Sequence, residues 1–209
     1  MSVINLQSAK VHFSQVDKLM AIELETALLS SSNKLRLPVP AKPAQYYQHL
    51  VRIVVGQQIS TKAAQSIYSA LESRITVTCN NVLATESNIL RECGLSLSKI
   101  KCIKELAAIW SQLDTASWSS QSDEAIAGRL VSCYGVGSWT ANMFLLFAMA
   151  RSDIFSIHDL GLRKRIAALY SIEIDDWQQI NCLADRWSPH RSVAALVLWH
   201  GLDNAPSPS

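Results

Sequence analysis

The stretch that decides the fold spans residues 130–159 and reads LVSCYGVGSWTANMFLLFAMARSDIFSIHD. It predicts the end of one helix, a tight turn at Gly135, Val136 and Gly137, and a second, apolar helix that Ser138 caps. Two glycines one residue apart allow positive φ and a close approach of another backbone. We therefore expect the N–H groups of the turn to lie at a helix N-terminus, where they can bind an anion. On its own, a G-x-G pattern is more typical of a plain connector between helices.

Three motifs occur together in this chain and carry a resemblance. The pattern L-x-x-C-x-G-V-G-x-x-T-A over residues 130–141, followed by an apolar helix and Asp159, resembles the helix-hairpin-helix–GPD superfamily of DNA glycosylases. The segments VGQQIS (residues 55–60) and WSPHRS (residues 187–192) resemble its alkylation-repair branch, the 3-methyladenine DNA glycosylase II family. The resemblance runs from about residue 46 to the C-terminus, and the first 45 residues carry no matching motif.

Composition restricts the class of protein. The chain has 209 residues, 49% of them apolar and 17% charged, which is typical of one globular domain or two tightly packed lobes. The longest apolar run, residues 143–150, is far too short to span a membrane. The N-terminus lacks the pattern of a signal peptide, so we expect an intracellular protein, in the cytoplasm or nucleoid of a bacterium or the nucleus of a eukaryote.

Charge gives only a weak indication of the partner. A net charge of +2 provides no global attraction to nucleic acid. Basic residues cluster at residues 163–165 and at Lys99, Lys101 and Lys104. Each cluster is, by itself, more typical of a solvated helix face than of a binding site.

The cysteines indicate neither a disulfide framework nor a zinc site. Their number is odd, they are widely spaced and no CxxC occurs, so we expect buried structural thiols. Some glycosylases of this superfamily carry a four-cysteine iron–sulfur cluster near the C-terminus. Because only one cysteine lies in that region here, we expect no such cluster. The five are Cys79, Cys93, Cys102, Cys133 and Cys182.

Hydrophobic periodicity predicts an all-α fold of about ten helices. Only residues 75–78 are β-prone, and residues 205–209 are expected to be frayed. The resemblance implies two helical lobes, with the helix-hairpin-helix motif and Asp159 at the cleft between them. Residues 46–151 would form the middle lobe with the hairpin, and residues 1–45 plus 152–209 the second lobe. The expected helices cover residues 16–30, 44–56, 61–71, 85–94, 98–113, 123–131, 139–150, 160–170, 176–186 and 189–200.

The resemblance implies that Asp159 is the catalytic residue. Cleavage of an N-glycosidic bond develops positive charge on the sugar, which a carboxylate can stabilise while it orients or deprotonates a water. One acid suffices when the leaving base is already cationic, as an N3- or N7-alkylated purine is. The sequence also predicts Asp159 as the N-cap of the helix over residues 160–170, and both roles are compatible. Asp153 competes but better suits a turn, and His158 is as readily a loop histidine as a residue beside the sugar.

The resemblance also suggests how DNA and the damaged base would be held. An extruded base needs flat, apolar walls. Trp139 and Trp199 stand at the family's base-pocket positions, with Met143 where some relatives have an aromatic residue; core packing explains each tryptophan equally well. Gln58, with Ile59 as the alternate, is the expected wedge that fills the gap left by a flipped nucleotide. The plain alternative is an ordinary connector between helices, with a glycine C-cap at residue 56.

Trp139 also decides the expected type of reaction. Glycosylases that nick the backbone use a lysine amine, which the hairpin motif places two residues after its second glycine. Since Trp139 stands there, the resemblance implies a monofunctional enzyme of the DNA-3-methyladenine glycosylase II type, without AP lyase activity. Two alternatives remain. One is a glycosylase for another damaged base, such as ethenoadenine, hypoxanthine or an oxidised base, and the other is a non-catalytic hairpin module that binds DNA.

The expected partner is double-stranded DNA that contains damaged bases, bound by a monomer. The three turn residues would hold a backbone phosphate through their amides. No cofactor is required by the chemistry, but the resemblance places a monovalent cation, Na⁺ or K⁺, on the main-chain carbonyls of Val131, Cys133 and Val136.

Overall fold

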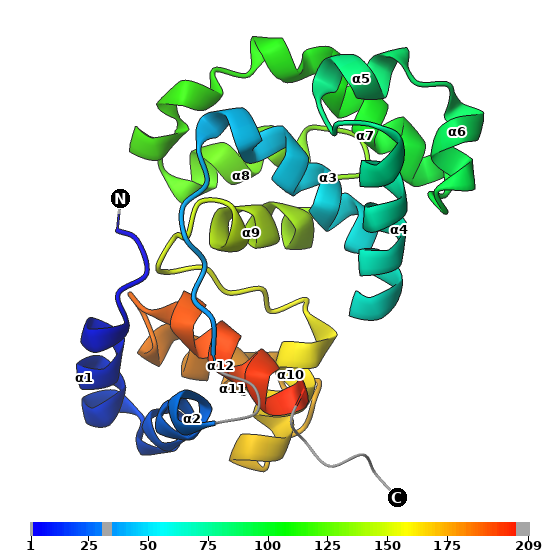
Figure 1. Ribbon diagram of the computed structural model, residues 1–209. Helices are drawn as coiled ribbons and strands as arrows, with labels where there is room; N and C mark the ends of the chain where they lie inside the picture. The colour runs from blue at the N-terminus through cyan, green and yellow to red at the C-terminus, as the bar shows by residue number, and fades with distance from the viewer. Residues whose placement is uncertain (1, 31–34, 204–209) are drawn as a thin grey trace, which may run out of the picture. The chain divides into compact units, whose positions relative to one another are not determined.

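The computed structural model describes residues 2–30 and 35–203, and most of these residues lie in helices (Figure 1). The described part holds twelve α-helices and three short 3₁₀ helices, and its β pairing is an isolated antiparallel bridge between Val3 and Arg151. The predicted all-α class is therefore confirmed. No described helix is both long and apolar enough to cross a membrane. Residues 205–209, predicted to be frayed, lie outside the described residues.

The elements follow one another along the chain in a simple order. They are α1 (Leu6–Val16), α2 (Lys18–Leu29), η1 (Pro43–Gln45), α3 (Tyr46–Gly56), α4 (Thr61–Arg74), α5 (Cys79–Ala84), α6 (Ser87–Glu92), α7 (Leu97–Ile109), η2 (Trp110–Gln112), η3 (Thr115–Ser120), α8 (Asp123–Val131), α9 (Ser138–Phe147), α10 (Leu160–Tyr170), α11 (Trp177–Arg186) and α12 (Arg191–Asp203).

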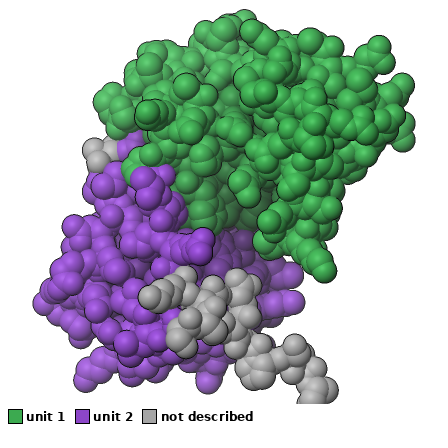
Figure 2. Space-filling view, viewed as in Figure 1, with its two compact units in different colours: residues 1, 40–149 green, residues 2–39, 150–209 purple. Residues whose placement is uncertain are grey.

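The chain divides into two compact units, coloured separately in Figure 2. Unit 1 is Pro40–Met149, and unit 2 combines Ser2–Val39 with Ala150–Ser209. The hairpin that follows α8 thus belongs to unit 1, whereas α10, with the carboxylate that precedes it, belongs to unit 2.

The core of unit 1 is built around α9. This helix packs against α3 and α8, and α3 also packs against α4 and α7. Most of α9 is buried, as its apolar sequence predicts. The rings of Tyr46, Trp118 and Phe144 meet with centroids 5.3 to 6.0 Å apart. The helix that begins at the hairpin is therefore anchored in the interior of its unit.

The N-terminal segment, which carries no recognisable motif, completes the core of unit 2. Helix α2 packs against α1 and α12, and α12 packs against α10. Asp17 joins these elements: its Oδ1 caps α2 by accepting from the Met20 amide at 3.1 Å. Its Oδ2 accepts from the Tyr170 hydroxyl at 2.7 Å and the Trp187 indole at 2.9 Å.

Several predicted helix boundaries are wrong because capping residues decide where helices begin. Asp17 interrupts the helix predicted over residues 16–30, so that α2 starts at Lys18 and α1, which was not predicted, precedes it. Thr78 caps another unpredicted helix, α5, through its hydroxyl. Pro189 was predicted in the first turn of the last helix, but α12 starts two residues later, at Arg191.

The cysteines are all free thiols, and their burial agrees only in part with the prediction. Cys93, Cys102 and Cys133 are buried. Cys79 is half-buried and Cys182 is exposed, so neither is a buried core thiol.

Candidate functional site

The turn between α8 and α9 contains two glycines in different conformations. Gly135 has φ of +75°, in the left-handed region that favours glycine. A Cβ at this position would lie 2.9 Å from Cys102 Cβ and 3.0 Å from its Sγ. Both the backbone conformation and the close approach of α7 therefore require glycine here.

Gly137 has neither of these reasons to be glycine. Its φ of −91° and ψ of 177° are open to any residue, and a Cβ would meet no atom within 4 Å. The expectation of positive φ thus holds for Gly135 only. Gly137 is also the N-cap of α9, whereas Ser138, the predicted cap, is the first residue of the helix. No side chain caps the N-terminus of α9. The space beside Gly137, at this end of the helix, is open.

Val136 anchors the turn between these glycines. Its side chain is buried, and its N–H donates to the Cys133 carbonyl at 3.2 Å. This amide, predicted to bind phosphate with those of its neighbours, therefore already has a partner inside the turn.

The carbonyls proposed for a cation lie at the carboxyl end of α8. Val131 is the last residue of that helix, and Cys133 and Val136 follow within the turn. Helix C-termini carry partial negative charge, which suits a cation. In the described residues, no group of three or more His, Cys, Asp and Glu side chains could hold a metal ion.

The loop between α3 and α4 carries the predicted wedge. Ser60 caps α4 through its hydroxyl. Gly56 is wrong as a C-cap, since it is still helical and Gln57 follows it as the cap. The left-handed residue is instead Gln58, with φ of +57°, and the side chains of Gln58 and Ile59 are exposed.

Asp159 caps α10, as the sequence predicts. Its Oδ1 accepts from the Leu162 amide at 2.9 Å and from the Trp199 indole Nε1 at 3.2 Å. Two donors on one oxygen fix the direction of the carboxylate. Trp199, predicted as a wall of the base pocket, is thus a direct partner of Asp159.

Gly161 is a residue that the sequence reasoning missed. A Cβ there would lie 3.0 Å from Asp159 Oδ1 and 3.7 Å from Trp199 Cδ1. Glycine costs a helix about 1 kcal/mol relative to alanine, so a glycine in the first turn of α10 was the available signal. Its place in the structure shows that it leaves room for the carboxylate.

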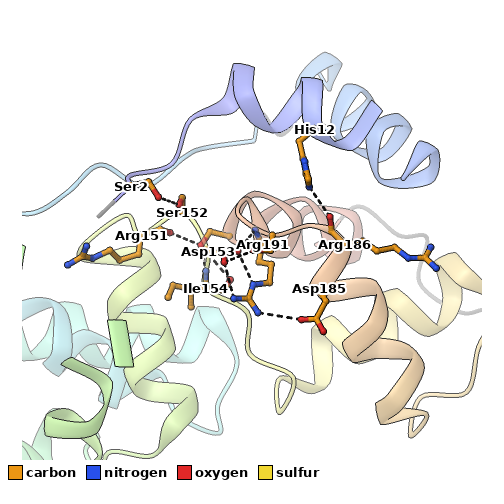
Figure 3. A network of polar contacts seen from close by, with 11 residues as sticks. Ser2, His12, Arg151, Ser152, Asp153, Ile154, Asp185, Arg186 and Arg191 are labelled. Atoms are coloured by element: carbon orange, nitrogen blue, oxygen red, sulfur yellow. Dashed lines mark hydrogen bonds and ion pairs between the residues drawn. The ribbon is translucent and has the colours of Figure 1, made fainter. Parts of the chain in front are cut away.

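Asp153, the competing carboxylate, is held inside an ion pair, as Figure 3 shows. Its Oδ1 accepts from Arg191 Nε at 2.8 Å, and its Oδ2 accepts from Arg191 Nη2 at 2.9 Å and from the Ser188 hydroxyl at 2.9 Å. Burial alone would raise the pKa of Asp153, but the hydrogen bonds from Arg191 and Ser188 outweigh it and hold the pKa below its usual value. Asp153 therefore serves the loop's structure.

The motif over residues 187–192 stabilises the same loop. The Ser192 hydroxyl donates to the Arg151 carbonyl at 2.6 Å and accepts from the Ile154 amide at 2.9 Å. These contacts join the start of α12 to the chain that leads into Asp159.

The other predicted residues lie on α9 and in unit 2. On α9, Trp139 and Met143 lie one turn apart, Trp139 half-buried and Met143 buried. In unit 2, the exposed His158 ring lies 5.7 Å from that of Trp177, over which the Arg163 guanidinium packs at 4.4 Å. The side chain of Arg163 is only 14% exposed and pairs with Asp175. The prediction of a solvated face is wrong at this position.

The structure therefore gathers the predicted residues into two groups. Unit 1 holds the hairpin, the wedge loop, Trp139 and Met143; unit 2 holds Asp159 with Trp199.

Comparisons with known proteins identify the family of the chain. The profile of the HhH-GPD superfamily base excision DNA repair proteins matches residues 51–189, so the chain belongs to that superfamily. DNA-3-methyladenine glycosylase 1 of Schizosaccharomyces pombe is 27% identical over 94% of this chain and 88% of its own length. DNA-3-methyladenine glycosylase 2 of Escherichia coli is 24% identical over 72% of this chain and 53% of its own.

Solved structures show the same fold. The S. pombe 3-methyladenine DNA glycosylase, in a complex with abasic DNA, aligns with a TM-score of 0.84 at 25% identity, covering 97% of this chain and 100% of that one. A DNA-3-methyladenine glycosidase from Bacillus halodurans aligns with a TM-score of 0.76 at 27% identity, covering 98% of this chain and 94% of that one.

Proposed function

We propose that the protein is a monofunctional DNA glycosylase that hydrolyses the N-glycosidic bond of alkylated purines, the first step of base excision repair. The observation that carries the proposal is the geometry of Asp159, whose Oδ1 is fixed by the Leu162 amide and the Trp199 indole. The substrate is double-stranded DNA with a damaged base. The protein acts as a monomer, in the cytoplasm or nucleoid of a bacterium or in the nucleus of a eukaryote.

The chemistry needs one fixed negative charge. When the bond between the anomeric carbon and the purine nitrogen breaks, both electrons leave with the base. An N3- or N7-alkylated purine carries a positive charge, so it departs neutral without being protonated. The Asp159 carboxylate stabilises the cationic sugar, and water adds to the anomeric carbon and loses one proton, which Asp159 or the solvent accepts. Because the donors are in place beforehand, no reorganisation is required during the reaction.

The absence of an amine at position 139 makes the reaction a hydrolysis. Trp139 stands where a lyase of this superfamily carries its nucleophilic lysine, and an indole cannot form a Schiff base. The product is an abasic site in an intact strand.

The hairpin supplies the grip on DNA. The open space in front of Gly137 and the uncapped start of α9 suit a backbone phosphate. A monovalent cation on the carbonyls of Val131, Cys133 and Val136 would add positive charge beside that phosphate. No cofactor takes part in the chemistry.

The base and the duplex are held by residues of the two groups described above. We assign the walls of the base pocket to Trp139, Met143 and Trp199. We assign the wedge to Gln58, because its side chain is exposed and its backbone is in the left-handed region. Ile59 is the alternative.

The test is excision from a panel of duplexes that each contain one lesion: 3-methyladenine, 7-methylguanine, ethenoadenine, hypoxanthine or 8-oxoguanine. We expect release of the alkylated purines, with strand breaks only after hot alkali. Strand breaks without alkali would contradict the monofunctional assignment. Release of the other bases alone would move the protein to another glycosylase class. Binding without release of any base would favour a non-catalytic hairpin module.

A further inference from the structure

Gln58 adopts a conformation that an L-residue with a side chain rarely adopts unless its surroundings enforce it. The loop that contains it is short, since α3 ends at Gly56 and α4 starts at Thr61. At its far end the Ser60 cap fixes the loop to α4. Its near end has two further restraints, both from side chains.

The first restraint is Lys99 of α7. Its ammonium donates to the Val55 carbonyl at 2.7 Å and to the Gln57 carbonyl at 2.9 Å. These carbonyls lie at the end of α3, where no further turn of helix supplies donors. Burial lowers the pKa of Lys99. Lys99 therefore acts as a cap supplied by a neighbouring helix, and the prediction that it lies on a solvated face is wrong.

The second restraint is the Gln57 side chain. Its Nε2 donates to the Thr140 hydroxyl at 2.8 Å and to the Gly135 carbonyl at 3.1 Å. Thr140 is buried in the first turn of α9, and Gly135 is the left-handed residue of the hairpin. One amide group thus ties the loop before Gln58 to the turn that would hold the phosphate.

We propose that Lys99 and Gln57 are positioning residues that hold the wedge loop in its projecting conformation and link it to the hairpin. The consequence is mechanical: when the hairpin is seated on a phosphate, Gln58 is already aimed at the base stack. This inference rests on the proposed function and deepens it, because it assigns the opening of the duplex to a linked unit of loop and hairpin.

A direct role for Lys99 in binding phosphate is the competing explanation. Two of the three N–H donors of its ammonium point to the Val55 and Gln57 carbonyls at the end of α3, so little of its hydrogen-bonding capacity remains for DNA. Lys101, two residues along the same helix, provides the contrast. Its side chain is 56% exposed and lies 4.2 Å above the Tyr134 ring, beside the hairpin.

The experiment compares Lys99→Met and Gln57→Leu with two controls. Lys101→Met removes the same charge from the same helix, and Lys99→Arg keeps donors for both carbonyls. Single-turnover release of an alkylated purine is measured from a duplex and from the same oligonucleotide as a single strand. We expect a loss of about tenfold or more on the duplex, since a small misplacement of a positioned group has effects of this size. On the single strand, where no stack has to open, the rate should change little. Lys101→Met should leave the ratio of the two rates unchanged, and Lys99→Arg should restore most of it.

Two outcomes would overturn the inference. An equal loss on both substrates would show that the two residues only support the fold or the chemistry. A decrease of about one in the slope of log affinity against log salt for Lys99→Met, absent for Gln57→Leu, would show that Lys99 contacts a phosphate.

A second measurement does not depend on base release. 2-Aminopurine placed beside an abasic-site analogue in duplex DNA brightens when its stacking is disturbed. The parent should raise this fluorescence at saturation, and Lys99→Met and Gln57→Leu should raise it much less. If the parent releases no base, the proposed function fails, and this signal still decides the role of the loop. Equal brightening by the parent and both variants would contradict the inference.

Discussion

Gly135 and Gly137 are separated by one residue and are glycines for different physical reasons. The fold requires glycine at position 135, because the backbone φ there is +75° and Cys102 leaves no room for a Cβ. The fold does not require glycine at position 137, since any residue can adopt this backbone conformation and a Cβ there would meet no atom within 4 Å. This difference supports our proposal that the backbone of a ligand can approach the chain at Gly137.

Gly137→Asp is expected to weaken DNA binding without unfolding the protein. The new side chain fits the open space, but its charge repels a phosphate held by the hairpin. Affinity for damaged and undamaged duplex should fall alike, by roughly tenfold or more, because phosphate contacts carry no sequence information. Titrations of both duplexes and a melting curve provide the check. As a contrast, Gly135→Ala should lower the Tm. Unchanged affinity of the Asp variant would remove the hairpin from the interface.

Asp159→Asn is expected to abolish base release while the fold and DNA binding survive. Asn caps a helix about as well as Asp, so the Tm should change little. The lost charge should cost on the order of 3 kcal/mol or more in the transition state, a hundredfold or greater in rate. Single-turnover excision beside a binding titration separates the two effects. A variant that cuts within a few-fold of the parent would reduce Asp159 to a helix cap.

Gly161→Ala should separate stability from activity. Alanine favours a helix by about 1 kcal/mol over glycine. Its Cβ would, however, lie 3.0 Å from Asp159 Oδ1 and 3.2 Å from Leu202 Cδ1, so the carboxylate and the Leu202 side chain have to shift by a few tenths of an ångström. We expect a Tm close to that of the parent and a clear loss in kcat. Gly128→Ala in α8 is the matched control, because nothing lies within 4 Å of its Cβ. If both variants retain full activity, the position of the carboxylate is not as restricted as the structure indicates.

At the scale of elements, what the sequence predicts best is the existence of helices. The 3.6-residue periodicity and polar caps such as Ser60 and Asp159 predict where most of them lie. The boundaries fail where a cap competes with the apolar pattern, as at Asp17, which ends one helix and begins the next. The sequence could not predict that Gln58 rather than Gly56 is left-handed, because contacts from Lys99 decide it. The different environments of Asp153 and Asp159 could not be predicted either, because each depends on a partner far along the chain. That partner is Arg191 for Asp153 and Trp199 for Asp159.

Arg191 at the start of α12 holds the loop before Phe155 through its ion pair with Asp153, so breaking this pair should lower the stability of the protein. Arg191→Gln leaves a partly buried carboxylate with fewer donors, which should cost about 2 kcal/mol. For a protein of this size the Tm should then fall by roughly 4–8 °C. Arg74→Gln is the control, since the Arg74–Glu92 pair is exposed and 3.4 Å long. Thermal melting of both variants provides the measurement. If the Tm falls by an equally small amount in both, the Asp153–Arg191 pair contributes little to stability.

At the scale of the whole molecule, unit 2 is assembled from both ends of the chain, and polar contacts carry part of that assembly. Ser8 on α1 hydrogen-bonds His190 Nε2 at 2.9 Å. The His12 ring lies 5.5 Å from that of His190, and His12 Nε2 donates to the Arg186 carbonyl at 2.8 Å. The groups that face His190 are thus Ser8, His12 and, through its charge, Asp153. Ionisable groups therefore lie where the N-terminal helix meets the C-terminal segment.

Acid should consequently destabilise the protein in two steps. Burial, with the charge of His12, lowers the pKa of His190, so below about pH 6.5 the unfolded chain binds a proton that the folded chain resists. Stability should begin to fall there. The pKa of Asp153 is also lowered, so its contribution is present above about pH 4 and is lost as the pH falls through its folded pKa. Melting curves between pH 7.5 and pH 3.5 should show both steps. His190→Gln cannot titrate and should flatten the upper step only, whereas a slope unchanged by this variant would mean that other groups cause it.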